Sequence, residues 1–154
     1  MDVDLEVRPF PGTGRVADVV PIFAAEEEPF LAAMNRGRLS LQRCSQCSRA
    51  RWPAAPACPY CGASKHVWDD VSPRGVVHSW VRYHRAFLPE FAPVVPYVVV
   101  AVELAAGPVI FGRLVDADTD PSAVTRIGDP VRAVVERWSD GDHLLAFTLD
   151  RENR

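Results

Sequence analysis

Two cysteine pairs decide the fold of this chain: Cys44-Ser45-Gln46-Cys47 and, after a gap of ten residues, Cys58-Pro59-Tyr60-Cys61. In each pair a tight turn directs both sulfurs to the same side, so four thiolates can surround one metal ion at about 2.3 Å per bond. These are all the cysteines of the 154-residue chain. The pattern predicts a closed, structural metal site, with zinc favoured and iron as the alternative.

The residues around the two pairs fit such a site. Pro53, Pro56 and Pro59 stiffen the connecting loop. Gly62 follows the second pair, at a place where a positive φ is often required, whereas Ser48 follows the first pair. We therefore expect two metal-binding turns, of which the first has the less suitable residue after it.

Two alternatives concern the same residues. Taken alone, the segment Cys58–Cys61 looks like a glutaredoxin active site, but that chemistry needs a low-pKa cysteine at the start of a helix that follows a β-strand. The preceding residues Ala54-Ala55-Pro56-Ala57 indicate neither a strand nor the start of a βαβ unit. His66 could replace a cysteine as a ligand. Because four thiolates are already available, we favour the four-cysteine site over both alternatives.

Composition and the first residues describe the class of protein. Hydrophobic residues make up 48% of the chain and charged residues 24%, as in soluble globular proteins. The first eight residues lack the basic and apolar regions of a signal peptide, and no apolar run approaches membrane-spanning length. We therefore expect a cytoplasmic protein with no membrane partner, in which reduced thiols favour a metal site over disulfides.

Charge is unevenly distributed along the chain. The net charge is −3, yet residues 29–68 contain six basic residues and no acidic residue. The six are Arg36, Arg38, Arg43, Arg49, Arg51 and Lys65. This basic segment is either a solvated face that balances the acidic flanking segments, or a seat for phosphates or for an acidic partner surface.

Sequence patterns divide the chain into three parts. Residues 1–25 contain the turn-forming segment 9–14 and are predicted to be an irregular N-terminal arm. Residues 26–70 begin with acidic residues and Pro29, which suit the first turn of a helix, and Gly37 is a plausible end of that helix. The alternation over residues 39–43 then predicts a strand that leads into the metal ribbon.

Residues 71–154 are predicted to be all β. Five segments are rich in β-branched and aromatic residues and are separated by turns: 75–87, 96–104, 108–115, 131–138 and 143–149. Closing five strands into a barrel removes the exposed edges, and the oligonucleotide/oligosaccharide-binding (OB) fold is the natural outcome. The expected architecture is mainly β: a helix, a metal ribbon and a five-stranded OB barrel.

Catalytic motifs are missing from the sequence. There is no Gly-x-Ser-x-Gly nucleophile elbow, no phosphate-binding P-loop and no dinucleotide-binding fingerprint. His78 and His84 share one side of the first barrel strand by parity, so a stand-alone enzyme acting through either histidine is one alternative. The main expectation is a chain without catalytic residues of its own.

An ordered set of motifs resembles a known family. The set comprises Leu39–Cys47, Trp52-Pro53, Cys58–Gly62, Gly75–Trp80, Pro96-Tyr97, Val102–Leu104 and Ile127–Val131. Together these segments look like the zinc-ribbon/OB-fold proteins known as domain of unknown function thirty-five, over residues 26–149. The resemblance implies a rubredoxin-like zinc ribbon after an N-terminal helix, and a C-terminal OB barrel.

The resemblance also implies a function. Family members are accessory subunits in acyl-CoA metabolism that accompany thiolase-fold enzymes, including lipid-transfer-protein-type thiolases and the aldolases of steroid side-chain breakdown. Others accompany enoyl-CoA hydratases. The expected role is thus a subunit of a lyase or acyltransferase complex, in which the partner supplies the chemistry and this chain stabilises it or aids acyl-CoA binding.

The basic segment connects this role to particular residues. CoA carries phosphates, and arginine binds phosphate oxygens in pairs. We therefore expect Arg49, Arg51 and Lys65 to help seat a CoA tail or an acidic partner surface. A nucleic-acid-binding OB module is another alternative, but the acidic barrel segment disfavours it because binding to a nucleic-acid backbone needs a basic groove.

Overall fold

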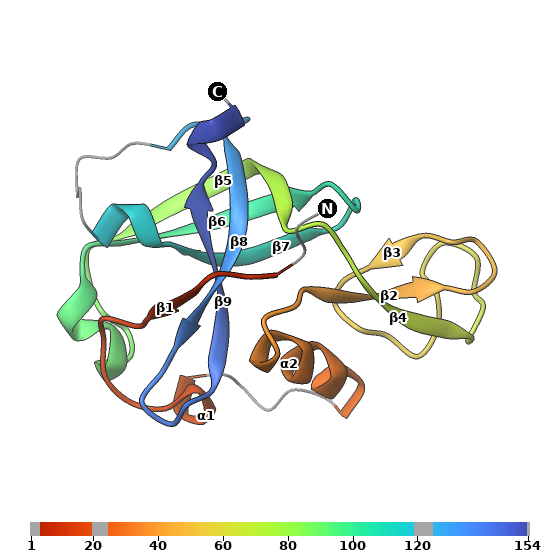
Figure 1. Ribbon diagram of the computed structural model, residues 1–154, viewed down its shortest axis with the longest axis horizontal. Coiled ribbons are helices and arrows are strands. Elements are labelled where there is room, and N and C mark those ends of the chain that lie inside the picture. The colour runs from red at the N-terminus through yellow and green to blue at the C-terminus, as the bar shows by residue number, and fades with distance from the viewer. Residues whose placement is uncertain (1–3, 20–24, 119–124, 154) are drawn as a thin grey trace.

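The C-terminal half of the chain forms a closed β-barrel (Figure 1). The computed structural model describes residues 4–19, 25–118 and 125–153. The barrel strands are β5 (Arg74–Tyr83), β6 (Tyr97–Leu104), β7 (Val109–Leu114), β8 (Pro130–Arg137) and β9 (His143–Leu149). Antiparallel pairing of β8 with β9 and parallel pairing of β7 with β9 close the barrel. The predicted five-stranded OB fold is confirmed.

Every second side chain along a barrel strand points inward, and these side chains fill the barrel. Val98, Val100 and Val102 of β6 point to the interior and are almost completely buried, together with Leu114 of β7 and Phe147 of β9. Three short 3-10 helices connect or follow the strands: η2 (Pro89–Val94), η3 (Val115–Asp118) and η4 (Arg151–Asn153). Among the described residues, no helix has the length and apolarity needed to cross a membrane.

Helix α2 (Glu28–Asn35) packs against the barrel and is preceded by η1 (Ala25–Glu27). Pro29 lies in its first turn, and Gly37 follows its end with a φ of +72°. Phe30 and Met34 are buried in the same core as the interior barrel residues. The predicted helix is confirmed, and its apolar face belongs to the main core of the protein.

The metal-ribbon segment forms a three-stranded antiparallel sheet. Strand β2 (Ser40–Cys44) lies between β3 (Ala50–Arg51) and β4 (His66–Asp70). The sequence predicts β2 but neither β3 nor β4. Leu39, directly before β2, and Leu41, within it, are buried in the barrel core. The ribbon projects to one side of the barrel (Figure 1), and its base is anchored by this shared core.

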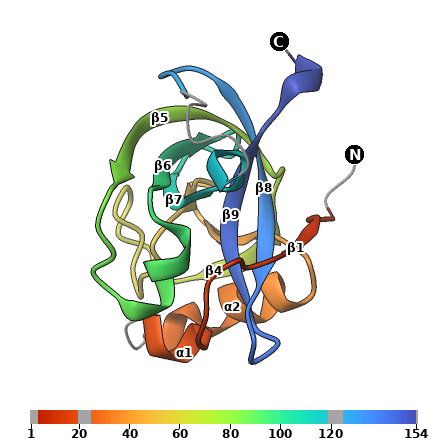
Figure 2. The same ribbon diagram turned by 90° about the vertical axis from the view of Figure 1, so that its left-hand side faces the viewer.

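The N-terminal segment differs from the irregular arm that the sequence predicts. It contains strand β1 (Val7–Pro9), which pairs in parallel with β8, and helix α1 (Val16–Val19). Figure 2 shows β1 crossing the outside of the barrel beside β8 and β9. Phe10 follows β1 and stacks on Trp138, with ring centroids 3.8 Å apart. Pairing with residues 135–137 and stacking on Trp138, all distant in sequence, give this segment its regular structure.

Candidate functional site

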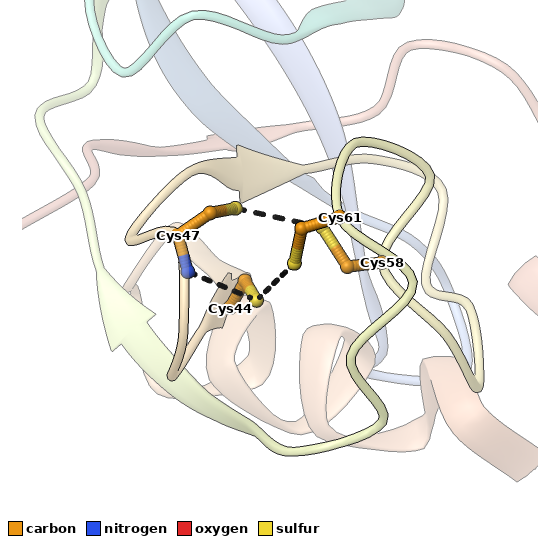
Figure 3. A group of neighbouring side chains, drawn as sticks. All are labelled: Cys44, Cys47, Cys58 and Cys61. Carbon is orange, nitrogen blue, oxygen red and sulfur yellow. Dashed lines mark hydrogen bonds between the residues drawn. The ribbon is translucent and has the colours of Figure 1, made fainter.

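The four cysteines lie together at the centre of the ribbon (Figure 3). All four Sγ atoms lie within 4.8 Å of one another. The Cys44–Cys61 and Cys47–Cys58 sulfur distances are both 3.6 Å. A tetrahedron with bonds of about 2.3 Å has edges of about 3.8 Å. The sulfur positions are therefore close to those of a tetrahedral four-thiolate site.

The two cysteine turns have the same backbone geometry. The N–H of Ser48 donates to the carbonyl of Cys44 at 3.0 Å, and the N–H of Gly62 donates to the carbonyl of Cys58 at 2.9 Å. Both residues adopt a positive φ, +63° at Ser48 and +80° at Gly62. Ser48 thus adopts the conformation for which glycine is better suited, and the first turn carries some backbone strain.

Backbone N–H groups stabilise negative charge on the sulfurs. Those of Cys47 and Gln46 donate to Cys44 Sγ and lower the pKa of that thiol. Burial raises the pKa of Cys58, but N–H groups of Tyr60 and Cys61 outweigh burial and lower it to about 6. These hydrogen bonds prepare the sulfurs to bind a cation as thiolates.

The fourth sulfur, that of Cys61, indicates that the cluster needs a cation. The N–H of Ala63 favours the Cys61 thiolate, but burial and the three neighbouring sulfurs outweigh it and raise the pKa of Cys61 to about 11. Four negative sulfurs at these distances need a positive ion between them. Four protein ligands leave no open coordination position, so the site is structural, and the residues suit zinc.

The alternative assignments of the ribbon residues do not match this geometry. Cys58 Sγ lies 3.6 Å from Cys47 Sγ of the other pair, and Cys58 lies in a loop instead of at a helix start. His66 Nε2 lies 3.2 Å from the amide nitrogen of Gln42, away from the sulfur cluster. The ribbon is therefore organised as a metal site, with neither a glutaredoxin-like dithiol nor a histidine ligand.

The three basic residues proposed to contact CoA or a partner lie in different environments. Arg49 is exposed, with its guanidinium 4.7 Å from the ring centroid of Tyr60, and Lys65 is also exposed. Arg51 is only 3% exposed. Its Nε donates to Gln42 Oε1 at 2.7 Å and its Nη2 to the carbonyl of Ala55 at 2.9 Å. In this structure Arg51 holds the ribbon loop and is not available at the surface.

Other cations of the basic segment are paired with acids from the flanking segments. Arg43 binds Asp69 at 2.7 Å, and Arg38 binds Asp4 at 3.0 Å and lies 3.8 Å from Asp70. Part of the segment therefore balances neighbouring acids, as the simpler interpretation of the charge pattern predicts. Its remaining exposed cations include Arg36, Arg49 and Lys65.

The histidines do not form a catalytic group. A bulge between Val77 and Ser79 shifts the register of β5, so the parity argument that places His78 and His84 on one side does not hold. Both side chains are exposed. His143 is buried, with Nδ1 3.1 Å from the carbonyl oxygen of Met34. Its contacts are those of a structural residue that ties β9 to α2.

A cavity beside the barrel is a feature that the sequence reasoning missed. It has a volume of about 580 Å³ and lies between α2, the ribbon residue Trp52, η2 and strands β5, β6 and β7. Its walls are mainly aromatic and aliphatic: Phe30, Met34, Trp52, Tyr83, Phe91, Tyr97, Val99, Ile110, Phe111, Gly112, Leu144 and Leu145, with Arg113 and Glu136 as charged members. Its size and lining are typical of a small-molecule site.

The charged members of the lining form a buried ion pair. Arg113 donates to Glu136 through Nε at 3.2 Å and through Nη2 at 2.9 Å, and the two side chains are 6% and 2% exposed. The ring of Phe10 lies over the guanidinium, 5.5 Å away. The pKa of Tyr97 in the same cavity is raised, mainly by burial and to a smaller extent by the nearby Tyr83. The cavity thus combines apolar walls with one neutralised pair of charges.

One sequence signal could have indicated this cavity. Residues 96–104 are apolar at nearly every position, whereas a barrel strand that faces water on its outside alternates apolar and polar residues. Tyr97, Val99 and Ala101 face outward, opposite to the interior residues 98, 100 and 102. An apolar outer face implies that something covers it, and here η2 and the cavity walls do so in part.

Comparison with known families gives two matches. Residues 32–67 match the family described as "ChsH2, rubredoxin-like zinc ribbon domain", and residues 68–136 match "ChsH2, C-terminal OB-fold domain". The boundary between them falls within β4. The first match includes all four cysteines, which supports zinc as the metal.

Curated proteins provide two relatives. Over 124 residues the chain is 37% identical to a "Probable enoyl-CoA hydratase alpha subunit" of Thermomonospora curvata, which covers 79% of this chain. The chain spans only 35% of that relative's length. Over 112 residues it is 32% identical to a "DUF35 domain-containing scaffold protein" of Methanothermobacter thermautotrophicus, covering 70% of this chain and 81% of the relative.

Solved structures share the fold. The structure described as "Ltp2-ChsH2(DUF35) aldolase" contains a chain that matches with a TM-score of 0.72 and 28% identity, over 84% of this chain and 98% of that chain. A DUF35 protein of unknown function from Sulfolobus solfataricus matches with a TM-score of 0.57 and 14% identity, over 82% and 87%. The second likeness concerns the fold alone.

Proposed function

The chain belongs to the DUF35 family, with a ChsH2-type zinc ribbon and OB fold, and from this premise we propose that it is an accessory subunit of an acyl-CoA-processing complex. Its partner would be a thiolase-fold enzyme, either a lipid-transfer-protein-type thiolase or an aldolase of steroid side-chain breakdown. The partner would supply the catalytic residues. This chain would stabilise the partner or help it to bind acyl-CoA in the cytoplasm.

One observation carries this proposal. The chain in the "Ltp2-ChsH2(DUF35) aldolase" structure is matched over 98% of its length, so the whole of that component, ribbon and barrel together, has a counterpart here. The scaffold protein of Methanothermobacter thermautotrophicus supports the same role by its description. The scattered, exposed positions of His78 and His84 give no support to a stand-alone enzyme.

A second candidate partner is an enoyl-CoA hydratase. The relative from Thermomonospora curvata is described as a probable alpha subunit of such an enzyme and shares 37% identity over 124 residues. About two thirds of that relative has no counterpart in this chain. Both candidates give this chain the same accessory role and differ in the reaction of the partner.

The described residues suggest a division of labour within the chain. Zinc held by Cys44, Cys47, Cys58 and Cys61 would supply folding energy to the ribbon. The exposed cations Arg49 and Lys65 would contact CoA phosphates or acidic partner residues, while Arg51 would hold the loop that carries Arg49. The apolar cavity would be available to the acyl group of the substrate.

Purification from the native host tests the proposal. A tagged copy is expected to bring a thiolase-fold enzyme or a hydratase in stoichiometric amount, identified by mass spectrometry. Acyl-CoA turnover by that enzyme is then measured with and without this chain. If no acyl-CoA enzyme accompanies the tagged protein, or if the chain alone converts acyl-CoA thioesters, the proposal is wrong.

A paired set of variants tests the role of the ribbon cations. Arg49→Ala/Lys65→Ala is expected to weaken acyl-CoA binding or complex formation, whereas Arg36→Ala removes an exposed cation outside the ribbon sheet and should change neither. Unchanged values for the double variant would exclude these two residues as contacts and leave the accessory role standing.

A further inference from the structure

The cavity beside the barrel offers a ligand no unbalanced charge. Its described lining contains one cation and one acid, Arg113 and Glu136, which bind each other through two hydrogen bonds. A carboxylate or phosphate inside the cavity would compete with Glu136 for Arg113 and would lose its hydration. The other walls are mainly aromatic and aliphatic. The cavity therefore suits an uncharged, apolar group.

The hydroxyl of Tyr97 is a polar group of the lining that has no protein partner. Tyr97 is 8% exposed, and its hydroxyl makes no hydrogen bond to any residue that the structure describes. Burial raises the pKa of this phenol, so at neutral pH it is protonated and can donate a hydrogen bond. A buried hydroxyl that donates to no acceptor costs free energy, which a suitable ligand would recover.

Neighbouring rings hold Tyr97 in a defined orientation. Its ring stacks on that of Tyr83, its cross-strand neighbour, with centroids 5.0 Å apart and planes inclined by 19°. The ring of Phe91 in η2 lies 5.1 Å from it. A donor held in place in this way loses little conformational entropy when a ligand binds. Tyr83 also lines the cavity but is only half-buried, so water solvates its hydroxyl more easily.

These features define the kind of group that the cavity accepts. A wholly apolar ligand would bury the Tyr97 hydroxyl without an acceptor, and an ionised ligand would be poorly solvated. An apolar group joined to one uncharged carbonyl avoids both costs. The acyl end of a thioester is such a group. Phe111 lines the cavity and is 67% exposed, so the cavity reaches solvent and the charged part of CoA can remain outside.

We propose that the cavity binds the acyl end of a thioester substrate, with its apolar group against the aromatic walls and its carbonyl oxygen accepting a hydrogen bond from Tyr97. This inference rests on the proposed acyl-CoA function and deepens it by naming the group that is bound and the residue that recognises it. Tyr97 is a binding residue here, and the reaction remains that of the partner.

The test uses the full-length, zinc-loaded chain without a partner. The probe is the N-acetylcysteamine thioester of cyclohexanecarboxylic acid, which is uncharged and lacks the CoA phosphates. The matching thioether, in which a methylene replaces the carbonyl, is the second probe. Calorimetry gives the dissociation constants of both probes for wild type, Tyr97→Phe and the control Tyr83→Phe, which removes the neighbouring hydroxyl.

A second pair of variants tests whether the probes bind in the cavity. Val99→Phe narrows the cavity, whereas Val67→Phe makes the same change on β4, where Val67 is 54% exposed and lies outside the cavity lining. Circular dichroism checks the fold of each variant. Tyr97→Phe removes only one oxygen atom, so it keeps the test valid if Val99→Phe folds poorly.

Wild type is expected to bind the thioester about fivefold to tenfold more tightly than the thioether, the value of one hydrogen bond. Tyr97→Phe should abolish this preference without weakening the thioether, and Tyr83→Phe should retain it. Val99→Phe should weaken both probes by about tenfold or more, and Val67→Phe should bind them like wild type. In infrared spectra, the carbonyl stretch of bound, isotope-labelled thioester should lie at lower frequency in wild type than in Tyr97→Phe.

Three results would overturn the proposal: no thioester binding by wild type at millimolar concentration, equal affinity for the two probes, or a preference for the thioester that Tyr97→Phe retains. Each would leave the accessory role intact, because co-purification tests that role separately. The expected binding pattern in a chain that brings no acyl-CoA enzyme from its host would support the site and refute the accessory role.

Discussion

The buried ion pair between Arg113 and Glu136 offers a sharp test of the packing beside the cavity. In Glu136→Gln the side chain keeps its shape, but the guanidinium of Arg113, which is 6% exposed, loses its countercharge. Removing one partner of a buried pair costs about 3–5 kcal/mol, because the remaining buried charge loses one of its compensating interactions. For a chain of this length that corresponds to a fall of about 6–20 °C in Tm.

A double replacement separates this cause from a simple loss of packing. Arg113→Met/Glu136→Leu removes both charges, and apolar replacement of a buried pair is often neutral. Since the contact of Arg113 with Phe10 is also lost, we expect a net cost of about 1 kcal/mol. The exposed Arg15–Asp18 pair provides the control, because solvent screens this pair and Asp18→Asn should leave the free energy of unfolding almost unchanged.

The measurement is urea unfolding of the zinc-loaded protein, followed by circular dichroism. A cost below about 1 kcal/mol for Glu136→Gln would refute the reasoning, since it would mean that water or another group neutralises Arg113. A double variant as unstable as the sum of the two single variants would refute it as well.

Three further predictions concern the ribbon and the N-terminal segment. Ser48→Gly should raise the free energy of unfolding by about 0.5–1 kcal/mol, because φ is +63° at this position. Gly62→Ala should lower it by about 1 kcal/mol because φ is also positive there, although the added Cβ would meet no atom within 4 Å. Denaturant titrations that give either variant the stability of wild type would contradict the prediction for that variant. Cys58→Ser should abolish stoichiometric zinc in metal analysis, and wild-type thiols should react with a thiol reagent only after chelation. Phe10→Ala should cost about 3 kcal/mol in the same titrations, and a loss below 1 kcal/mol would mean that the stack on Trp138 is unimportant.

The metal site and the order of the main elements were predictable because their causes are local. Two turns that each present two sulfurs require only neighbouring residues, so the spacing predicts the cluster that the structure contains. The strands of the barrel follow from runs of β-branched residues separated by turns, and the ends of α2 follow from Pro29 and Gly37.

Features that depend on distant contacts were not predictable in this way. Strand β1 exists because Val7–Pro9 pair with residues 135–137 of β8, far along the chain. Arg51 is charged, and charged side chains are mostly exposed, yet Gln42 and Ala55 bind it in the interior of the ribbon. The bulge in β5 changes which residues lie on the same side of the strand, and no residue near it in the sequence indicates a bulge.

The amino-acid sequence by itself determined the four-cysteine cluster, the class of fold and the family, because each depends on residue types at short and definite spacing. Only the tertiary structure decided where charged and aromatic side chains meet. It buries Arg113 against Glu136, stacks Phe10 on Trp138 and leaves Phe87 and Phe111 exposed beside a cavity. The reason is physical: burial, ion pairing and surface exposure are properties of neighbours in space, and barrel closure brings together residues that lie far apart in the chain.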